Sequence, residues 1–142
     1  RGLHPDLEDQ FGCTDPKQTP CAIYDATDID KMIQDGITSI HDAQGHGTHV
    51  TSIAAGNGGT MLFPNPIYAG VAPGATLIVA SPSSGEGFYD ADVLNAARFV
   101  FDRADYMGLP IAVNLSVGGD FGPHEGTSSL EKGLYSSFYT FR

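Results

Sequence analysis

Two apolar runs, separated by a segment with helical spacing, constrain the fold of this chain most strongly. Residues 75–81 and 110–117 are almost continuously apolar, as parallel strands are when both faces of their sheet are covered. Asp90 can cap the helix between them, and Gly108 can end it. Strand, helix and strand in this order predict a right-handed crossover and an α/β fold with a mainly parallel sheet. The apolar residues expected on one face of this helix are Val93, Ala97, Val100, Phe101 and Ala104.

Residues 45–50, Gly-His-Gly-Thr-His-Val, carry the clearest functional signal. A histidine before a small-residue turn and an apolar stretch is expected at the start of a helix, with its ring directed outward, where imidazole can act as a base. The alternative for His46 is a polar loop residue, the usual role of a lone histidine in a glycine-rich segment. The spacing of His41, His46 and His49 does not match the His-Glu-x-x-His pattern, which argues against zinc.

The segment around His46 closely resembles the active-site histidine segment of the subtilisin-like serine proteases, the subtilases or peptidase S8 family. The resemblance implies that residues 1–142 are the N-terminal part of a peptidase S8 catalytic domain, incomplete at both ends. The expected fold is a three-layer α/β structure with a mainly parallel sheet, a partial subtilisin-like fold. Other stretches resemble family segments in the same order: His4-Pro5-Asp6-Leu7, Gly70-Val71-Ala72-Pro73-Gly74-Ala75 and Asn114-Leu115-Ser116-Val117-Gly118-Gly119.

The same resemblance implies the roles of individual residues. His46 is the general base of a Ser-His-Asp mechanism, and His49 is a packed neighbour. The strand end at Ser116, Val117 and Gly118 lines the primary specificity pocket, in agreement with the binding of ligands outside the carboxyl ends of parallel strands. A glycine-rich edge, Gly85, Glu86 and Gly87, pairs with the extended substrate, because glycine lets another backbone approach closely. An ordinary surface turn is the alternative for this edge.

The rest of the triad is not expected within this chain. In the family the aspartate precedes the stretch that begins here at His4, and the serine follows well after the strand that ends here at Gly119. Ser128, with Glu131 three residues later, predicts a helix-capping box rather than a nucleophile. The chain alone is therefore predicted to be inactive, its partners being a companion polypeptide with the serine and aspartate and a peptide or protein substrate. The alternative is a non-catalytic peptide-binding or interaction module derived from a protease.

Cys13 and Cys21 bracket a proline-containing loop, which favours a local disulfide. Asp6 matches a family carboxylate that ligates structural calcium, so it is a candidate calcium ligand, while catalysis itself is expected to need no cofactor. A further acidic cluster is more typical of a solvated face than of an ion site. Its members are Asp25, Asp28 and Asp30.

The charge balance excludes one class of partner. The net charge is −10, and the 7 Lys and Arg residues form no run that would neutralise phosphates, which argues against nucleic acid. No stretch approaches the ~20 apolar residues that a membrane span requires. The sequence thus predicts part of a secreted or extracytoplasmic serine endopeptidase.

Overall fold

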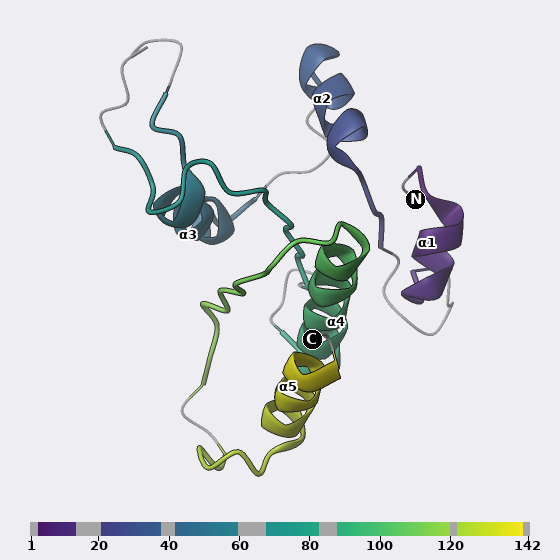
Figure 1. Cartoon of the computed structure of the whole chain (residues 1–142), viewed down its shortest axis with the longest axis vertical. Helices are drawn as coiled ribbons and strands as arrows, with labels where there is room; N and C mark the ends of the chain where they lie inside the picture. The colour runs from purple at the N-terminus through teal and green to yellow at the C-terminus, as the bar shows by residue number, and fades with distance from the viewer. Residues whose placement is uncertain are drawn as a thin grey trace. The chain divides into compact units, whose positions relative to one another are not determined.

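The computed structural model describes residues 3–13, 21–37, 42–59, 68–82, 88–119 and 122–140 (Figure 1). These ranges contain five helices: α1 (Pro5–Gln10), α2 (Ala26–Gln34), α3 (His46–Ala55), α4 (Asp90–Tyr106) and α5 (Ser129–Thr140). The chain divides into two compact units, one formed by Arg1–Ile37 with Ile78–Arg142 and the other by Thr38–Leu77. None of the helices in the described ranges is both long and apolar enough to cross a membrane.

The predicted three-layer fold with a parallel sheet is wrong, because the described residues form helices and no strand. Residues 75–81 and 110–117, expected to be buried strands, are irregular. A parallel strand buries its side chains only when neighbouring strands pair with it and helices cover the sheet. Here Leu77, Val79 and Leu115 remain 53%, 68% and 42% exposed. The apolar composition of a run therefore did not suffice to predict strand pairing.

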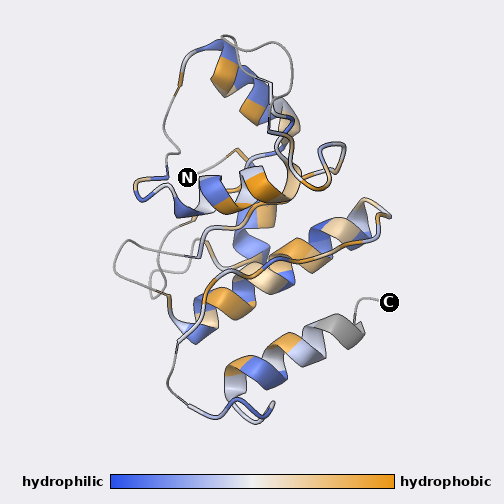
Figure 2. Ribbon diagram, turned by 90° about the vertical axis from the view of Figure 1, so that its left-hand side faces the viewer, coloured by the Kyte–Doolittle hydropathy of each residue, from blue (hydrophilic) through white to orange (hydrophobic). Residues whose placement is uncertain are grey.

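Helix α4 forms where the sequence predicts it and supplies most of the core of its unit. Tyr89, rather than Asp90, is the N-cap residue, and Asp90 is the first residue of the helix. The chain leaves the helix at Gly108, whose φ of 64° is the left-handed conformation that favours glycine. Figure 2 shows apolar positions recurring along α4 between polar ones. The buried residues of the helix are Val93, Ala97, Phe101 and Ala104.

Helix α5 packs against α4, and the two lie side by side in Figures 1 and 2. The contact is close at Gly133, where a Cβ would lie 2.5 Å from Cδ2 of Leu94. Glycine at this position thus makes room for the leucine side chain of the neighbouring helix.

Helix α1 is attached to the same unit through its C-terminal end. The rings of Phe11 and Phe99 meet edge to face with their centroids 5.1 Å apart, a favourable arrangement for an aromatic pair. Glu8 is fully buried, and its Oε1 accepts a hydrogen bond from the backbone N–H of Ile23 at 3.2 Å. The Glu8 side chain of α1 thus holds the segment that leads into α2.

In the Thr38–Leu77 unit, the segment after residue 68 closes the C-terminal end of α3. Its N–H groups donate to carbonyl groups at the end of the helix, which would otherwise lack partners. Gly70 lies so close that a Cβ there would be 2.7 Å from the backbone nitrogen of Ala55. The backbone hydrogen bonds are Gly70 to Gly56 (2.7 Å), Val71 to Ile53 (3.0 Å) and Ala72 to Ala54 (2.8 Å).

Candidate functional site

His46 is the first residue of α3, and its side chain is exposed, as the sequence predicts for a histidine directed outward. The N-cap position before it is Gly45, whose φ of 74° lies in the left-handed region. His49, expected to be a packed neighbour, is exposed as well. The helix therefore presents His46 at the surface of its first turn.

A carboxylate outside the helix caps α3, because Gly45 has no side chain that could do so. Oδ1 of Asp42 accepts the backbone N–H of Gly45 at 2.9 Å, and Oδ2 accepts that of Thr48 at 2.8 Å. The hydrogen bond from Thr48, together with that from Gly45, lowers the pKa of Asp42 below its usual value. Asp42 was not predicted from the sequence. The signal that could have identified it is an aspartate shortly before a helix whose N-cap is glycine.

The predicted substrate-binding residues Ser116, Val117 and Gly118 lie in the other unit of the chain. They belong to an irregular segment and are all exposed. Nδ2 of Asn114 donates a hydrogen bond to Oγ of Ser116 at 2.9 Å. The second predicted edge, Gly85, Glu86 and Gly87, lies outside the described residues.

The hydroxyl of Ser128 is part of a helix cap, as predicted. Its Oγ accepts the backbone N–H of Glu131 at 3.1 Å, and Oε2 of Glu131 accepts the backbone N–H of Ser128 at 2.9 Å. Oε1 of Glu131 also accepts the N–H of Gly126 at 3.0 Å. The side chain and backbone of Ser128 lower the pKa of Glu131 to about 2. This reciprocal pair is a capping box that starts α5, and it accounts for a serine that resembles a nucleophile.

His4 meets two of the acidic residues at the start of α2, a contact that the sequence analysis did not anticipate. Nε2 of His4 lies 2.7 Å from Oδ2 of Asp28 and 3.8 Å from Oδ2 of Asp25. Asp25 and Asp28 also form a capping box with each other's backbone N–H groups. The N–H of Asp25, followed by the His4 side chain, lowers the pKa of Asp28. Capping of α2 thus explains Asp25 and Asp28 of the acidic cluster. The third member, Asp30, is not part of the group that these two residues form with His4.

Asp6, the candidate calcium ligand, is exposed in the first turn of α1. Calcium takes six to eight oxygen ligands, so a protein site needs several converging oxygens. Among the described residues, His, Cys, Asp or Glu side chains bring three or more possible metal-ligand atoms close together only at His4, Asp25 and Asp28. Asp6 is not part of this group. Calcium binding at Asp6 stays a prediction, because backbone carbonyl oxygens can also ligate calcium.

Cys13 and Cys21 form the disulfide that the sequence predicts, with their sulfur atoms 2.00 Å apart. Cys13 is buried, and its backbone N–H donates to the carbonyl oxygen of Glu8 at 2.8 Å. The bridge is thereby attached to the C-terminal end of α1.

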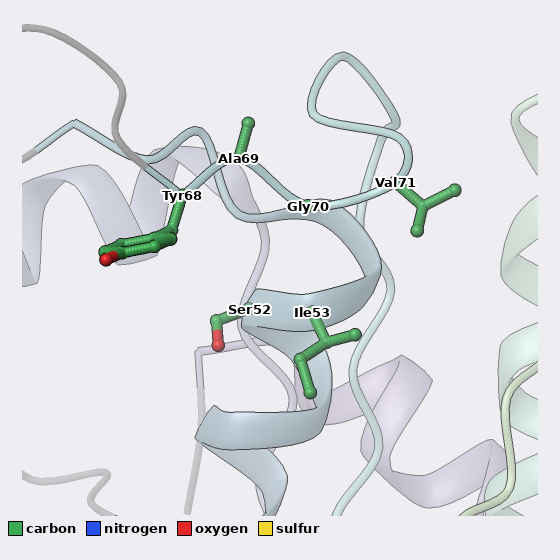
Figure 3. A pocket seen from close by; sticks show the side chains of 6 residues that line it. All are labelled: Ser52, Ile53, Tyr68, Ala69, Gly70 and Val71. Atoms are coloured by element: carbon green, nitrogen blue, oxygen red, sulfur yellow. The ribbon is translucent and has the colours of Figure 1, made fainter.

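A hollow of about 320 Å³ lies over the C-terminal half of α3. It is separate from the first turn of the helix, where His46 lies. The only hydroxyl groups in it belong to Tyr68, which is 86% exposed, and Ser52, whose Oγ donates to the carbonyl of His49 at 2.9 Å. The hollow therefore brings no catalytic constellation together. Figure 3 shows its lining: Ser52, Ile53, Tyr68, Ala69, Gly70 and Val71.

The sequence of the chain is similar to those of several known proteases. The chain is 35% identical over 108 residues to subtilisin-like protease SBT1.5 of Arabidopsis thaliana. It is 38% identical over 94 residues to a subtilisin of Bacillus sp. (strain TA39), and 38% identical over 99 residues to bacillopeptidase F of Bacillus subtilis (strain 168). These matches cover 73%, 65% and 63% of this chain. No solved structure matches the chain.

The matched regions are a small part of the relatives, and the chain spans 13%, 20% and 6% of their respective lengths. The family model for the subtilase family matches residues 3–137, which is nearly all of this chain. The match includes both His46 and the segment at Ser116. The chain therefore belongs to the subtilase family of peptidases.

Proposed function

We propose that this chain supplies the general base of a serine endopeptidase, and that His46 is this base. The observation that carries the proposal is an exposed histidine at the first turn of a capped helix, within a chain that belongs to the subtilase family. General bases need access to the proton that they remove, and the position of His46 provides it. Its relatives described above are named as proteases.

In the proposed reaction, the unprotonated imidazole of His46 accepts the proton of a serine hydroxyl as the serine attacks the peptide carbonyl. The resulting imidazolium donates this proton to the leaving amine. Water then repeats the cycle on the acyl-enzyme, with His46 again as base and then as acid. An aspartate holds the imidazole in the required tautomer.

The serine and aspartate are proposed to lie on a companion polypeptide. Ser128 is a poor candidate for the nucleophile, because its Oγ accepts a hydrogen bond from the N–H of Glu131 at the start of α5. Asp42 is a poor candidate for the orienting acid, because each of its carboxylate oxygens accepts a backbone N–H. Both residues have a local structural role, which supports the need for a partner.

The substrate is proposed to be a peptide or protein in extended conformation. Ser116, Val117 and Gly118 are proposed to line the pocket for the residue before the scissile bond, and Gly85, Glu86 and Gly87 to pair with the substrate backbone. The exposure of residues 116–118 supports this proposal, since a binding edge must be accessible. The protein is further proposed to be secreted, which the disulfide supports because such bonds persist in oxidising compartments.

The test is a fluorophosphonate reaction on the protein purified from its source together with its accompanying polypeptides. Fluorophosphonates label a serine only when a base activates it. Intact mass under denaturing conditions is expected to show an adduct on a polypeptide other than this chain. His46→Gln should slow labelling by a factor of about 10² or more, the contribution of a general base. The matched control is His49→Gln, which removes the other exposed histidine of α3 and should label at the unsubstituted rate.

Two results would contradict the proposal. Absence of any adduct would indicate a protein without an activated serine, and the function would then be that of a non-catalytic peptide-binding or interaction module. Equal labelling of the His46→Gln and unsubstituted proteins would show that another group activates the serine.

A further inference from the structure

We propose that Asp42 is a positioning residue for His46, which it holds in place through the first turn of α3. This inference rests on the proposed role of His46 as general base. It differs from that role because the atoms concerned are backbone amides and a carboxylate outside the helix. Asp42 is expected to contact neither the substrate nor the reacting atoms.

Both ends of α3 are held by hydrogen bonds with groups outside the helix. The helix has ten residues and none of them is buried. Isolated helices of this length are marginal in water, so a helix depends on its ends and on packing. Its C-terminal end is held by the N–H groups of residues 70–72. At its N-terminal end, the N-cap residue is Gly45, which has no side chain that could cap the helix.

Asp42 provides the missing attachment on both sides of His46 in the sequence. One oxygen binds the N–H of Gly45, the residue before the histidine, at 2.9 Å, and the other binds the N–H of Thr48 at 2.8 Å. A Cβ at position 47 would lie 3.4 Å from Oδ2, in van der Waals contact with the carboxylate, which shows how closely Asp42 approaches the first turn. The carboxylate therefore bridges the first turn and fixes the peptide planes from which His46 projects.

The charge of Asp42 adds to this attachment. A carboxylate at a helix N-terminus is favoured by the partial positive charge of the unpaired N–H groups. These N–H groups also lower the pKa of Asp42, so the carboxylate stays ionised at a lower pH than an ordinary aspartate does. Since proton transfer requires the base within hydrogen-bond reach of the serine, a frayed first turn is expected to remove His46 from that position.

The experiment compares Asp42→Ala, which removes the acceptor, with Asp42→Asn, which keeps one acceptor oxygen. The matched control, Asp30→Ala, removes the same charge from the exposed side of α2. Initial rates of the assembled protease are measured over a range of fluorescein-labelled casein concentrations. For Asp42→Ala, kcat is expected to fall about tenfold or more with KM unchanged, since ~1 Å misplacement of a catalytic group can cost ~10²-fold. Asp42→Asn, which keeps one of the two acceptors but not the charge, should recover part of this loss.

The second readout uses the 142-residue chain itself, labelled with 15N and 13C. Asp42→Ala is expected to speed amide exchange at Thr48 and to average the side-chain couplings of His46. Asp42→Asn should have a smaller effect of the same kind, and Asp30→Ala should leave both unchanged. Unchanged exchange and couplings in Asp42→Ala, or a rise of KM alone, would overturn the inference.

The two proposals fail in different ways. If the unsubstituted protease does not cleave casein, the proposed function fails, and the Thr48 exchange and His46 couplings alone decide whether Asp42 positions the histidine. If cleavage requires His46 but Asp42→Ala retains full kcat, the general base stands and the positioning role is overturned.

Discussion

At the scale of single residues, carboxylates at helix starts recur in this chain. Asp28, Asp42 and Glu131 each accept backbone N–H groups at the first turn of a helix, and these hydrogen bonds lower the pKa of all three. A carboxylate bound in this way stabilises the folded chain in its ionised form. Its contribution is complete above its ordinary pKa and is lost as the pH falls through the lowered value. These residues thus link helix stability to acid.

Glu131 allows the sharpest test of this link, because its pKa is lowered from 4.5 to about 2. We expect the hydrogen bonds from Ser128 and Gly126 to persist as the pH falls below 4.5 and to be lost only near pH 2. The measurement is a 13C NMR titration of the Glu131 carboxyl, together with the amide signal of Ser128. Glu131→Gln should remove this acid transition at Ser128, because its amide does not titrate. A carboxyl midpoint near 4.5 would contradict the prediction.

At the scale of elements, local patterns predicted helices well where the pattern itself causes the structure. The apolar stripe of α4 and the Ser128–Glu131 box of α5 act within a few residues, so the sequence alone could reveal them. The exact N-cap was missed at Asp90, because Tyr89 takes that position without a side-chain hydrogen bond. Asp42 was missed since it caps α3 from outside the usual N-cap position.

Packing between α4 and α5 leads to a prediction about Gly133. Alanine is favoured over glycine in a helix by about 1 kcal/mol. A Cβ at position 133 would, however, lie 2.5 Å from Cδ2 of Leu94, so the leucine would have to move. We expect Gly133→Ala to destabilise the chain by about 1 kcal/mol when Leu94 is present, because an overpacking cost of about 2 kcal/mol outweighs the helix gain. With Leu94→Ala, the same change should stabilise it by up to about 1 kcal/mol.

The measurement is a double-mutant cycle by urea denaturation, followed by circular dichroism. Leu94→Ala alone serves as the reference for the second arm of the cycle. Free-energy changes that add within about 0.5 kcal/mol would show that the two positions are not coupled, and would contradict the prediction.

At the scale of the whole molecule, the sequence predicted the family and the accessible histidine but not the architecture. The motif around His46 is contiguous, so it can be identified without the fold. A parallel sheet depends on pairing between strands far apart in the chain, and the composition of residues 75–81 and 110–117 did not determine this pairing. The predicted binding role of residues 116–118 stays a prediction for the same reason, because it depends on which segments lie nearby.

Exposed apolar segments and a large net charge have opposite effects on association of the molecule. Val79, Leu115 and Val117 are 68%, 42% and 37% exposed, and apolar surface of this kind favours contacts between molecules. The net charge of −10 at pH 7 opposes such contacts by repulsion. Because carboxylates gain protons as the pH falls, this repulsion vanishes near the isoelectric point of about 4.5. We therefore expect the chain to be monomeric at neutral pH and to associate as the pH approaches 4.5.

Sedimentation velocity and light scattering between pH 7.5 and 4.5 would measure this association. The double variant Val79→Ser, Leu115→Ser should associate less at pH 4.5, because it removes apolar surface without changing the charge. Gln34→Ser, an exposed polar substitution in α2, is the control and should behave as the unsubstituted chain. Equal association of the double variant and the control would assign the effect to charge alone. A chain that stays monomeric at pH 4.5 would show that its exposed apolar segments do not drive contacts between molecules.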